Sequence, residues 1–206
     1  MRSAGAAIAR LSDPEAEVSA HYVIAEDGRT TRLVNEDRRA WHAGVGCWGA
    51  VRDVNSHAIG IELANAGPLT GFPPFPAPQM SALEGLLRGI LGRWSISPAR
   101  VIAHSDMAPL RKFDPGPKFD WQRLALQGLS VWPAPPRSLP ANADAATFRG
   151  ACIAFGYDPE VPPPALLAAF RLRFRPGATG ALDRYDVALA IDLGQRFPVD
   201  RRIGNP

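Results

Sequence analysis

The sequence predicts an α/β protein with a mixed central sheet flanked by helices, followed by a small three-helix module. Short β-rich runs alternate with helical patterns up to about residue 130. A proline-rich stretch without periodicity, typical of a linker, then covers residues 134–143, and helical spacing resumes beyond it. We therefore expect one domain over residues 1–133 and a helical domain over residues 144–200.

Four runs are expected to form strands. Residues 21–35, HYVIAEDGRTTRLVN, place two β-rich runs around an Asp-Gly turn, which predicts a hairpin. Residues 58–65, AIGIELAN, alternate aliphatic residues on one face with Gly60, Glu62 and Ala64 on the other. A further short run, VIAH, ends at His104 and is also predicted to be a strand.

The helices are predicted from apolar residues spaced three and four positions apart. This spacing extends from Ser81 to Trp94, and a shorter helix is expected over residues 120–127. In the C-terminal region the same spacing recurs three times, in Phe148 and Cys152, in Leu166, Phe170 and Phe174, and in Leu182, Tyr185 and Leu189. About fifty residues of this kind make a small bundle that is plausible as an accessory module.

Composition excludes several classes of function. The 206 residues carry a net charge of only +3 without a basic cluster, which argues against a nucleic-acid-binding surface. Cys47 and Cys152 stand far apart and are interpreted as small hydrophobic residues. No apolar run approaches the length of a membrane span, and the N-terminal AGAAIA is shorter than the core of a signal peptide, so we expect a cytoplasmic protein as written.

Four residues are candidates for chemistry. His104 and Asp114 are zinc-ligand types, although a core histidine and a turn aspartate explain them more simply from the residues alone. Glu62 occupies the middle of a strand, where it faces either solvent or a cleft. Lys112 is either an ion-pair partner of Asp114 or a cation in a site. The only two lysines of the chain, Lys112 and Lys118, both lie near Asp114.

A glycine-rich aromatic stretch, RAWHAGVGCWGA, lies between the hairpin and the strand of Glu62. Trp41, His42 and Trp48 either line a groove for a sugar or peptide or pack the loop on itself. The residues alone leave these two interpretations open.

Three stretches together carry a family resemblance: EVSAHYVIAEDGRTTRLVNEDRRAWHAG, NSHAIGIELAN and AHSDMAPLRKFDPGPKFDW. They closely resemble the type 2 zinc-dependent N-acetylmuramoyl-L-alanine amidases of the AmpD/AmiD group, which share a fold with peptidoglycan recognition proteins. A later stretch, FRLRFRPGATGALDRYDVALAI, more weakly resembles the three-helix peptidoglycan-binding module that accompanies some of these amidases.

The resemblance implies a function and a site. It implies hydrolysis of the amide between N-acetylmuramic acid and L-alanine in peptidoglycan or anhydro-muropeptides, with Zn2+ as cofactor and no nucleic-acid or membrane partner. By the resemblance, His104 and Asp114 are zinc ligands, Glu62 is the acid/base residue, and Lys112 faces the developing oxyanion. The resemblance also implies a substrate cleft, to which we assign His21, Trp41, His42 and Asn55.

The sequence departs from the family pattern at one zinc ligand. The family has a third ligand, a histidine on the first strand, and this chain has no matching run; His21 follows that place and is a weaker candidate. We expect that the gene product extends upstream of Met1, which would also leave export open, since AmiD-type relatives are exported and AmpD-type relatives are cytoplasmic. The alternative function is non-catalytic peptidoglycan recognition. For the amidase, truncation after about residue 135 is expected to impair binding to polymeric wall more than hydrolysis of small fragments.

Overall fold

The structure is a computed structural model that describes residues 3–200 and divides them into two compact units. The first unit consists of residues 3–46, Arg52–Ile96 and Lys118–Asp120. The second unit consists of Cys47–Val51, Ser97–Pro117 and residues 121–200. Neither unit is therefore one continuous stretch of sequence.

A three-stranded sheet in the order β2-β1-β3 forms the centre of the first unit. β1 (Tyr22–Ile24) and β2 (Thr30–Arg32) are antiparallel and form the predicted hairpin. β3 (Ile61–Leu63) runs parallel to β1 and places Glu62 opposite Val23. The sheet is therefore mixed, as the sequence predicts.

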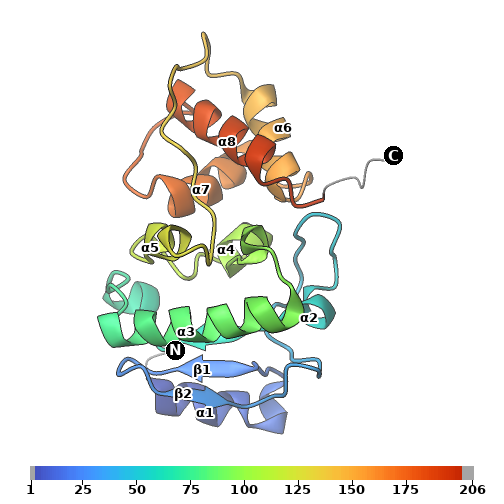
Figure 1. Ribbon diagram of the computed structural model, residues 1–206, viewed down its shortest axis with the longest axis vertical. Coiled ribbons are helices and arrows are strands. Elements are labelled where there is room, and N and C mark those ends of the chain that lie inside the picture. The colour runs from blue at the N-terminus through green and yellow to red at the C-terminus, as the bar shows by residue number, and fades with distance from the viewer. Residues whose placement is uncertain (1–2, 201–206) are drawn as a thin grey trace. The chain divides into compact units, whose positions relative to one another are not determined.

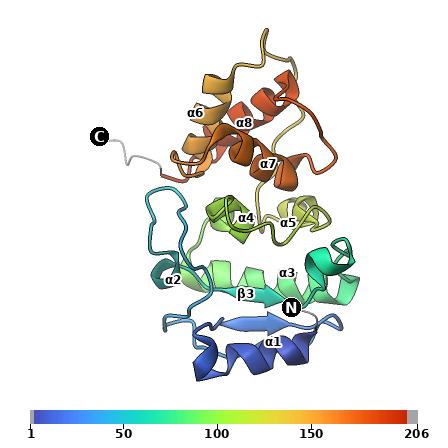
Figure 2. The same cartoon turned by 180° about the vertical axis from the view of Figure 1, so that it is seen from behind.

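Helices cover both faces of this sheet, which lies between α1 and α3 in both views (Figures 1 and 2). α1 (Ala4–Leu11) packs Ala7 and Leu11 against Val23 of β1 and against Ala20, which precedes this strand. α3 (Ala77–Trp94) buries Met80, Leu83, Leu87 and Ile90. The remaining short elements of this unit are α2 (Val54–His57) and the 3-10 turns Pro14–Ala16 and Gly67–Thr70.

The hairpin turn approaches the start of α3 closely. Gly28 has a left-handed φ of +87°, and a Cβ at this position would lie 2.7 Å from the carbonyl oxygen of Pro78. Pro78 itself lies in the first turn of α3, where its missing N–H costs no hydrogen bond. The helix begins at Ala77, four residues before the predicted start at Ser81.

Three helices in the second unit correspond to the predicted three-helix module. They are α6 (Ala145–Phe155), α7 (Pro163–Phe174) and α8 (Arg184–Arg196). Their buried apolar residues include Phe148, Cys152, Leu166, Phe170, Phe174, Val187, Leu189 and Leu193. α6 and α8 approach closely at Gly194, where a Cβ would lie 2.7 Å from the carbonyl oxygen of Ala151.

The second unit also contains α4 (His104–Met107), α5 (Trp121–Leu126) and the 3-10 turn Pro98–Arg100. The predicted linker, 134–143, lies in a stretch without helix or strand, but Ser97–Pro117 groups with the C-terminal helices in one compact unit. The predicted domain limits stay a prediction. No helix within residues 3–200 is long and apolar enough to cross a membrane.

Residues 101–103 are not a strand, so the prediction for VIAH was wrong. The backbone is extended at Val101 and Ala103, but two of its polar groups bond to side chains and not to a neighbouring strand. The N–H of Ala103 donates to Asp106 Oδ2 at 2.9 Å, and the carbonyl oxygen of Val101 accepts from Arg173 at 3.1 Å. His104 therefore begins α4 instead of ending a strand.

Candidate functional site

His104 and Asp114 lie side by side in the second unit. Nδ1 of His104, the first residue of α4, is 2.5 Å from Oδ2 of Asp114. The backbone closes the same loop, because the N–H of Ser105 donates to the carbonyl oxygen of Asp114 at 3.1 Å. The loop that leaves α4 therefore returns to it and brings the two predicted ligands together.

Charge around Asp114 favours its ionised form. Burial alone would raise its pKa, but the hydrogen bond from His104 and the positive charges of His104 and Lys112 outweigh this effect. The pKa of Asp114 is therefore lowered below its ordinary value of 3.8. An ionised carboxylate beside an imidazole is the protonation state that a cation would require.

The pair matches zinc in chemistry and supplies two ligands. An imidazole nitrogen and a carboxylate oxygen are both common zinc ligands, and two ligands of one tetrahedral zinc ion lie about 3.3 Å apart. The 2.5 Å contact is thus a direct hydrogen bond that metal uptake would replace. Within residues 3–200, no cluster of three or more His, Cys, Asp or Glu side chains is arranged to hold a metal. His104 and Asp114 fit two of the three protein ligands usual at catalytic zinc.

The two lysines of the chain have different environments. Lys112 is half-buried on the loop between the two candidate ligands, and its backbone N–H donates to the carbonyl oxygen of Ala108 at 3.0 Å. Lys118 is exposed in the first unit, where its Nζ donates to the carbonyl oxygen of Gly71 at 3.2 Å. Only Lys112 acts on the pKa of Asp114.

Glu62, the candidate acid/base residue, lies in the first unit. It is half-buried in the middle of β3. The preceding Gly60 leaves space for the ring of His42, since a Cβ at residue 60 would collide with that ring. The structure thus explains why residue 60 is a glycine.

His21 and Asn55 are bound to backbone within the first unit. His21 is 1% exposed; its Nδ1 accepts from the N–H of Gly60 at 2.9 Å, so its Nε2 donates to the carbonyl oxygen of Arg38 at 2.9 Å. Asn55 Oδ1 accepts from two consecutive N–H groups, those of His42 and Ala43. Both side chains therefore hold the loop in place, and both ring nitrogens of His21 and Oδ1 of Asn55 are bound to backbone.

The aromatic residues of this loop separate into different roles. Trp41 is 55% exposed, with the guanidinium of Arg39 stacked 4.1 Å from the ring centre. His42 is half-buried and its Nε2 lies 3.3 Å from the carbonyl oxygen of Ala58. Trp48 belongs to the second unit, is 2% exposed and contacts Phe155 and Tyr157 edge to face. Packing therefore accounts for Trp48, whereas Trp41 offers an open ring face or edge to a ligand.

Three residues that bind one another at α4 were not singled out from the sequence: Asp106, Arg173 and Tyr157. Asp106, two positions after His104, is fully buried with Arg173 and Tyr157 as partners. One signal was present: Arg173 follows Phe170 by three residues and precedes Phe174, and so falls on the apolar stripe of its helix. A charge on such a stripe indicates a buried ion pair.

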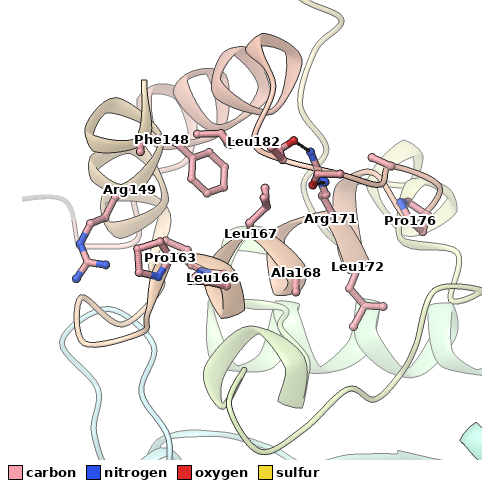
Figure 3. Close-up of a pocket in the computed structure, with 15 residues that line it drawn as sticks. Phe148, Arg149, Pro163, Leu166, Leu167, Ala168, Arg171, Leu172, Pro176 and Leu182 are labelled. Carbon is pink, nitrogen blue, oxygen red and sulfur yellow. Dashed lines mark hydrogen bonds between the residues drawn. The ribbon is translucent and has the colours of Figure 1, made fainter. Parts of the chain in front are cut away.

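A separate cavity lies within the C-terminal helices. Its volume is about 610 Å³, and it lies between α6, α7 and the segment before α8 (Figure 3). Phe148, Leu167 and Leu182 line it, with Arg149 and Arg171 among the polar contributors. The guanidinium of Arg171 is held by the carbonyl oxygens of Gly180 and Ala181.

The fold and this pair define a known class of protein. A family model described as N-acetylmuramoyl-L-alanine amidase matches residues 1–117. The chain belongs to this family, whose members are generally zinc-dependent. The predicted family, enzyme class and α/β fold are thereby confirmed.

Individual relatives are similar over much of the chain. The N-acetylmuramoyl-L-alanine amidase AmiD of Escherichia coli is 36% identical over 94% of this chain and 79% of its own length. The 1,6-anhydro-N-acetylmuramyl-L-alanine amidase AmpD of Haemophilus influenzae is 41% identical, over 52% of this chain and 56% of its own length.

Solved structures of two relatives have the same fold. AmiD from E. coli, in complex with the substrate anhydro-N-acetylmuramic acid-L-Ala-D-gamma-Glu-L-Lys, matches with a TM-score of 0.85 at 35% identity, over 95% of this chain and 86% of that one. AmpDh3 from Pseudomonas aeruginosa, in complex with anhydromuramic pentapeptide, matches with a TM-score of 0.80 at 31% identity, over 94% of this chain and 88% of that one. All of these relatives are bacterial proteins.

Proposed function

We propose that this chain hydrolyses the amide between N-acetylmuramic acid and L-alanine in muropeptides, anhydro-muropeptides included, with one zinc ion. The observation that carries the proposal is the pairing of His104 and Asp114 at 2.5 Å, with Lys112 on the loop between them. Two relatives with the same fold have been solved with anhydromuramyl peptides. The same class of compound is therefore the proposed substrate.

Each candidate residue has one task in this proposal. His104 and Asp114 would hold the zinc ion, which would supply a Lewis acid when bound. Glu62 takes a proton from the attacking water and delivers it to the departing amine nitrogen. Lys112 places a positive charge toward the oxyanion that forms from the amide carbonyl. Water adds to the carbonyl carbon, the C–N bond breaks, and the products are a carboxylate on the sugar and a free amine on the stem peptide.

The ring of Trp41 is the proposed contact for the sugar. Its exposed face and edge are amphipathic in the way that carbohydrate-binding surfaces require. His42 is a second candidate on the same loop. The side chains of His21 and Asn55 hold this loop through hydrogen bonds to backbone groups.

One observation favours a second function, non-catalytic recognition of peptidoglycan. The described residues supply only two zinc ligands. A recognition protein would bind wall fragments without zinc and release no peptide. Metal content and turnover separate the two functions.

The deciding experiment measures both quantities on the same preparation. The protein is purified, its zinc is quantified by atomic absorption, and peptide release from an anhydro-muropeptide is followed by liquid chromatography. About one zinc ion per chain with peptide release supports the amidase. A folded protein that binds the muropeptide, carries no zinc and releases nothing is a recognition protein.

Variants of Glu62 and Asp114 test the two kinds of role. Glu62→Gln is expected to retain zinc and lower kcat by about 10²–10⁴-fold, because it removes the proton carrier. Asp114→Ala is expected to lower zinc occupancy itself, because it removes a ligand. A Glu62→Gln protein that works at the normal rate would refute the acid/base assignment.

The two lysines form a matched pair for the oxyanion role. Lys112→Ala is expected to lower kcat by about 10²–10³-fold, the usual loss when one oxyanion-stabilising group is removed. Lys118→Ala removes the same charge from an exposed position and should leave kcat within about twofold. Equal losses in the two variants would mean that general charge, and not Lys112, supports the rate.

We also propose that residues 144–200 retain the enzyme on polymeric peptidoglycan. The cavity of about 610 Å³ in this region supplies a concave apolar surface with arginines among its lining residues. Leu167→Gln places an amide in the cavity and is expected to lower binding to sacculi in a pull-down assay, with little change in hydrolysis of soluble muropeptides. Leu126→Gln changes an 83% exposed leucine on α5 and serves as the control.

A further inference from the structure

We propose that Arg173, on α7, is a positioning residue for the metal-binding loop. Through Asp106 it fixes α4 and therefore the ring of His104. The inference depends on the proposed function of His104, and it adds a residue some seventy positions away in sequence to the support of the site.

Asp106 is the point at which α4 is held. It is the third residue of α4 and 0% exposed. Its Oδ2 accepts from the N–H of Ala103 at 2.9 Å and from Arg173 Nη1 at 2.7 Å. Its Oδ1 accepts from the hydroxyl of Tyr157 at 3.1 Å. Three residues of three segments thus bind one carboxylate, two positions after the candidate ligand.

Arg173 binds α4 and the segment that precedes it. One guanidinium nitrogen donates to Asp106, and the other donates to the carbonyl oxygen of Val101 and to the hydroxyl of Ser130, each at 3.1 Å. The guanidinium also stacks 3.9 Å from the ring centre of Trp121, at the start of α5. Because the fork is planar and 1% exposed, it fixes the direction of these groups as well as their distance.

Tyr157 completes the arrangement from the end of α6. Burial and the negative charge of Asp106 raise the pKa of Tyr157 well above 10, so its hydroxyl stays protonated and donates. Two residues from the C-terminal helical region therefore bind one carboxylate of α4. Groups that orient a metal ligand in this way usually change metal affinity by 10–100-fold when removed.

The matched control is the neighbouring buried arginine on the same helix. Arg171 pairs with the 0% exposed Asp186 at 2.6 Å and donates to the carbonyl oxygens of Gly180 and Ala181. All of these partners belong to α8 or to the segment that leads into it. Arg171→Met thus breaks a comparable buried ion pair without touching the described partners of α4.

The experiment compares Arg173→Met, Arg173→Lys and Arg171→Met in the full chain, far below their melting temperatures. Zinc affinity is measured by competition with a chelator, and amide hydrogen exchange of Asp106–Ala108 is measured on metal-free protein. Arg173→Met is expected to weaken zinc binding at least tenfold and to speed this exchange at least tenfold relative to Arg171→Met. Arg173→Lys, which keeps the charge but loses the fork, should fall between wild type and Arg173→Met.

Two results would overturn the proposal. One is equal exchange of the α4 amides in Arg173→Met and Arg171→Met; the other is zinc affinity of Arg173→Met within about twofold of wild type. If Arg173→Met does not fold, Arg173→Lys and Tyr157→Phe carry the same comparison. A wild-type protein that binds no zinc would refute the proposed function alone, because the exchange measurement on metal-free protein still tests the role of Arg173.

Discussion

Glu36 in the first unit and Asp106 in the second have similar partners but different access to solvent. Glu36 accepts from the hydroxyl of Tyr22 at 2.7 Å, from Arg93 at 2.5 Å and from the indole of Trp94 at 2.6 Å. Asp106 likewise accepts from a tyrosine and an arginine. The side chain of Glu36 is 11% exposed beside an arginine that is 54% exposed, whereas Asp106 and its arginine are 0% and 1% exposed.

This difference in exposure decides what each carboxylate does. Water can replace part of the network around Glu36, so that network strengthens the first unit by an amount that depends on pH and salt. Around Asp106 no solvent can replace a lost partner, and an unpaired charge would remain buried. Loss of a partner should therefore destabilise the protein more at Asp106 than at Glu36. Asp106 also lies two residues from a candidate zinc ligand.

Truncation after residue 135 should have the largest effect, because it removes both Arg173 and Tyr157 from Asp106. We expect loss of zinc uptake together with at least a hundredfold loss of hydrolysis of soluble muropeptides. This revises the expectation from the sequence, which treated the helices as an accessory for wall binding. Zinc content, muropeptide turnover and circular dichroism test it, and a folded, fully active truncated protein would contradict it.

Asp106→Ala is expected to destabilise the protein by about 3–5 kcal/mol, the usual loss when one partner of a buried ion pair is removed. Chemical denaturation at pH 7 measures this change. Asp192→Ala, which removes a partly exposed carboxylate paired with Arg196 in the same unit, is the control and should cost far less. Similar losses in the two variants would remove the distinction between buried and exposed carboxylates.

Much of the fold could be predicted because its signals are local. The Asp-Gly turn at Gly28 and the apolar spacing of Leu166, Phe170 and Phe174 predicted the hairpin and the second C-terminal helix. The prediction failed at residues 101–103, since a β-branched run does not reveal that its backbone will bond to Asp106 and to Arg173. Such partners are distant in sequence and are set by tertiary packing.

The candidate site was predictable to a similar degree and for the same reason. The family resemblance, and not the residue types alone, assigned His104 and Asp114 as a ligand pair, and the structure brings them to 2.5 Å. The structural part played by His21 could not be inferred, because it depends on backbone groups of Arg38 and Gly60. Sequence indicates which groups can do chemistry, but their supports follow from the fold.

Glu36→Gln should have an intermediate effect that depends on pH. The hydrogen bonds from Arg93, with those from Trp94 and Tyr22, outweigh partial burial and lower the pKa of Glu36 from 4.5 to about 2. A depressed carboxylate pKa stabilises the folded state above pH 4.5 and loses this contribution as the pH falls toward 2. After allowance for solvent screening, we expect the variant to be about 1–2 kcal/mol less stable at pH 7. Urea denaturation at pH 7 and pH 3 should show the difference shrinking at the lower pH; a constant difference would contradict the assignment.

Arg39→Ala should have the smallest effect. Arg39 binds both carboxylate oxygens of Asp53 at 3.2 Å, so its geometry is bidentate. The two side chains are 41% and 48% exposed, however, and water can take over both hydrogen bonds. We therefore expect no measurable change in the free energy of unfolding, by the same urea assay and at both low and high salt. Asp53→Ala should lower the free energy of unfolding more than Arg39→Ala, since Asp53 also caps α2 by accepting from the N–H of Ser56. If Arg39→Ala were instead as damaging as Glu36→Gln, bond number and geometry, and not access to solvent, would decide which ion pairs hold this protein together.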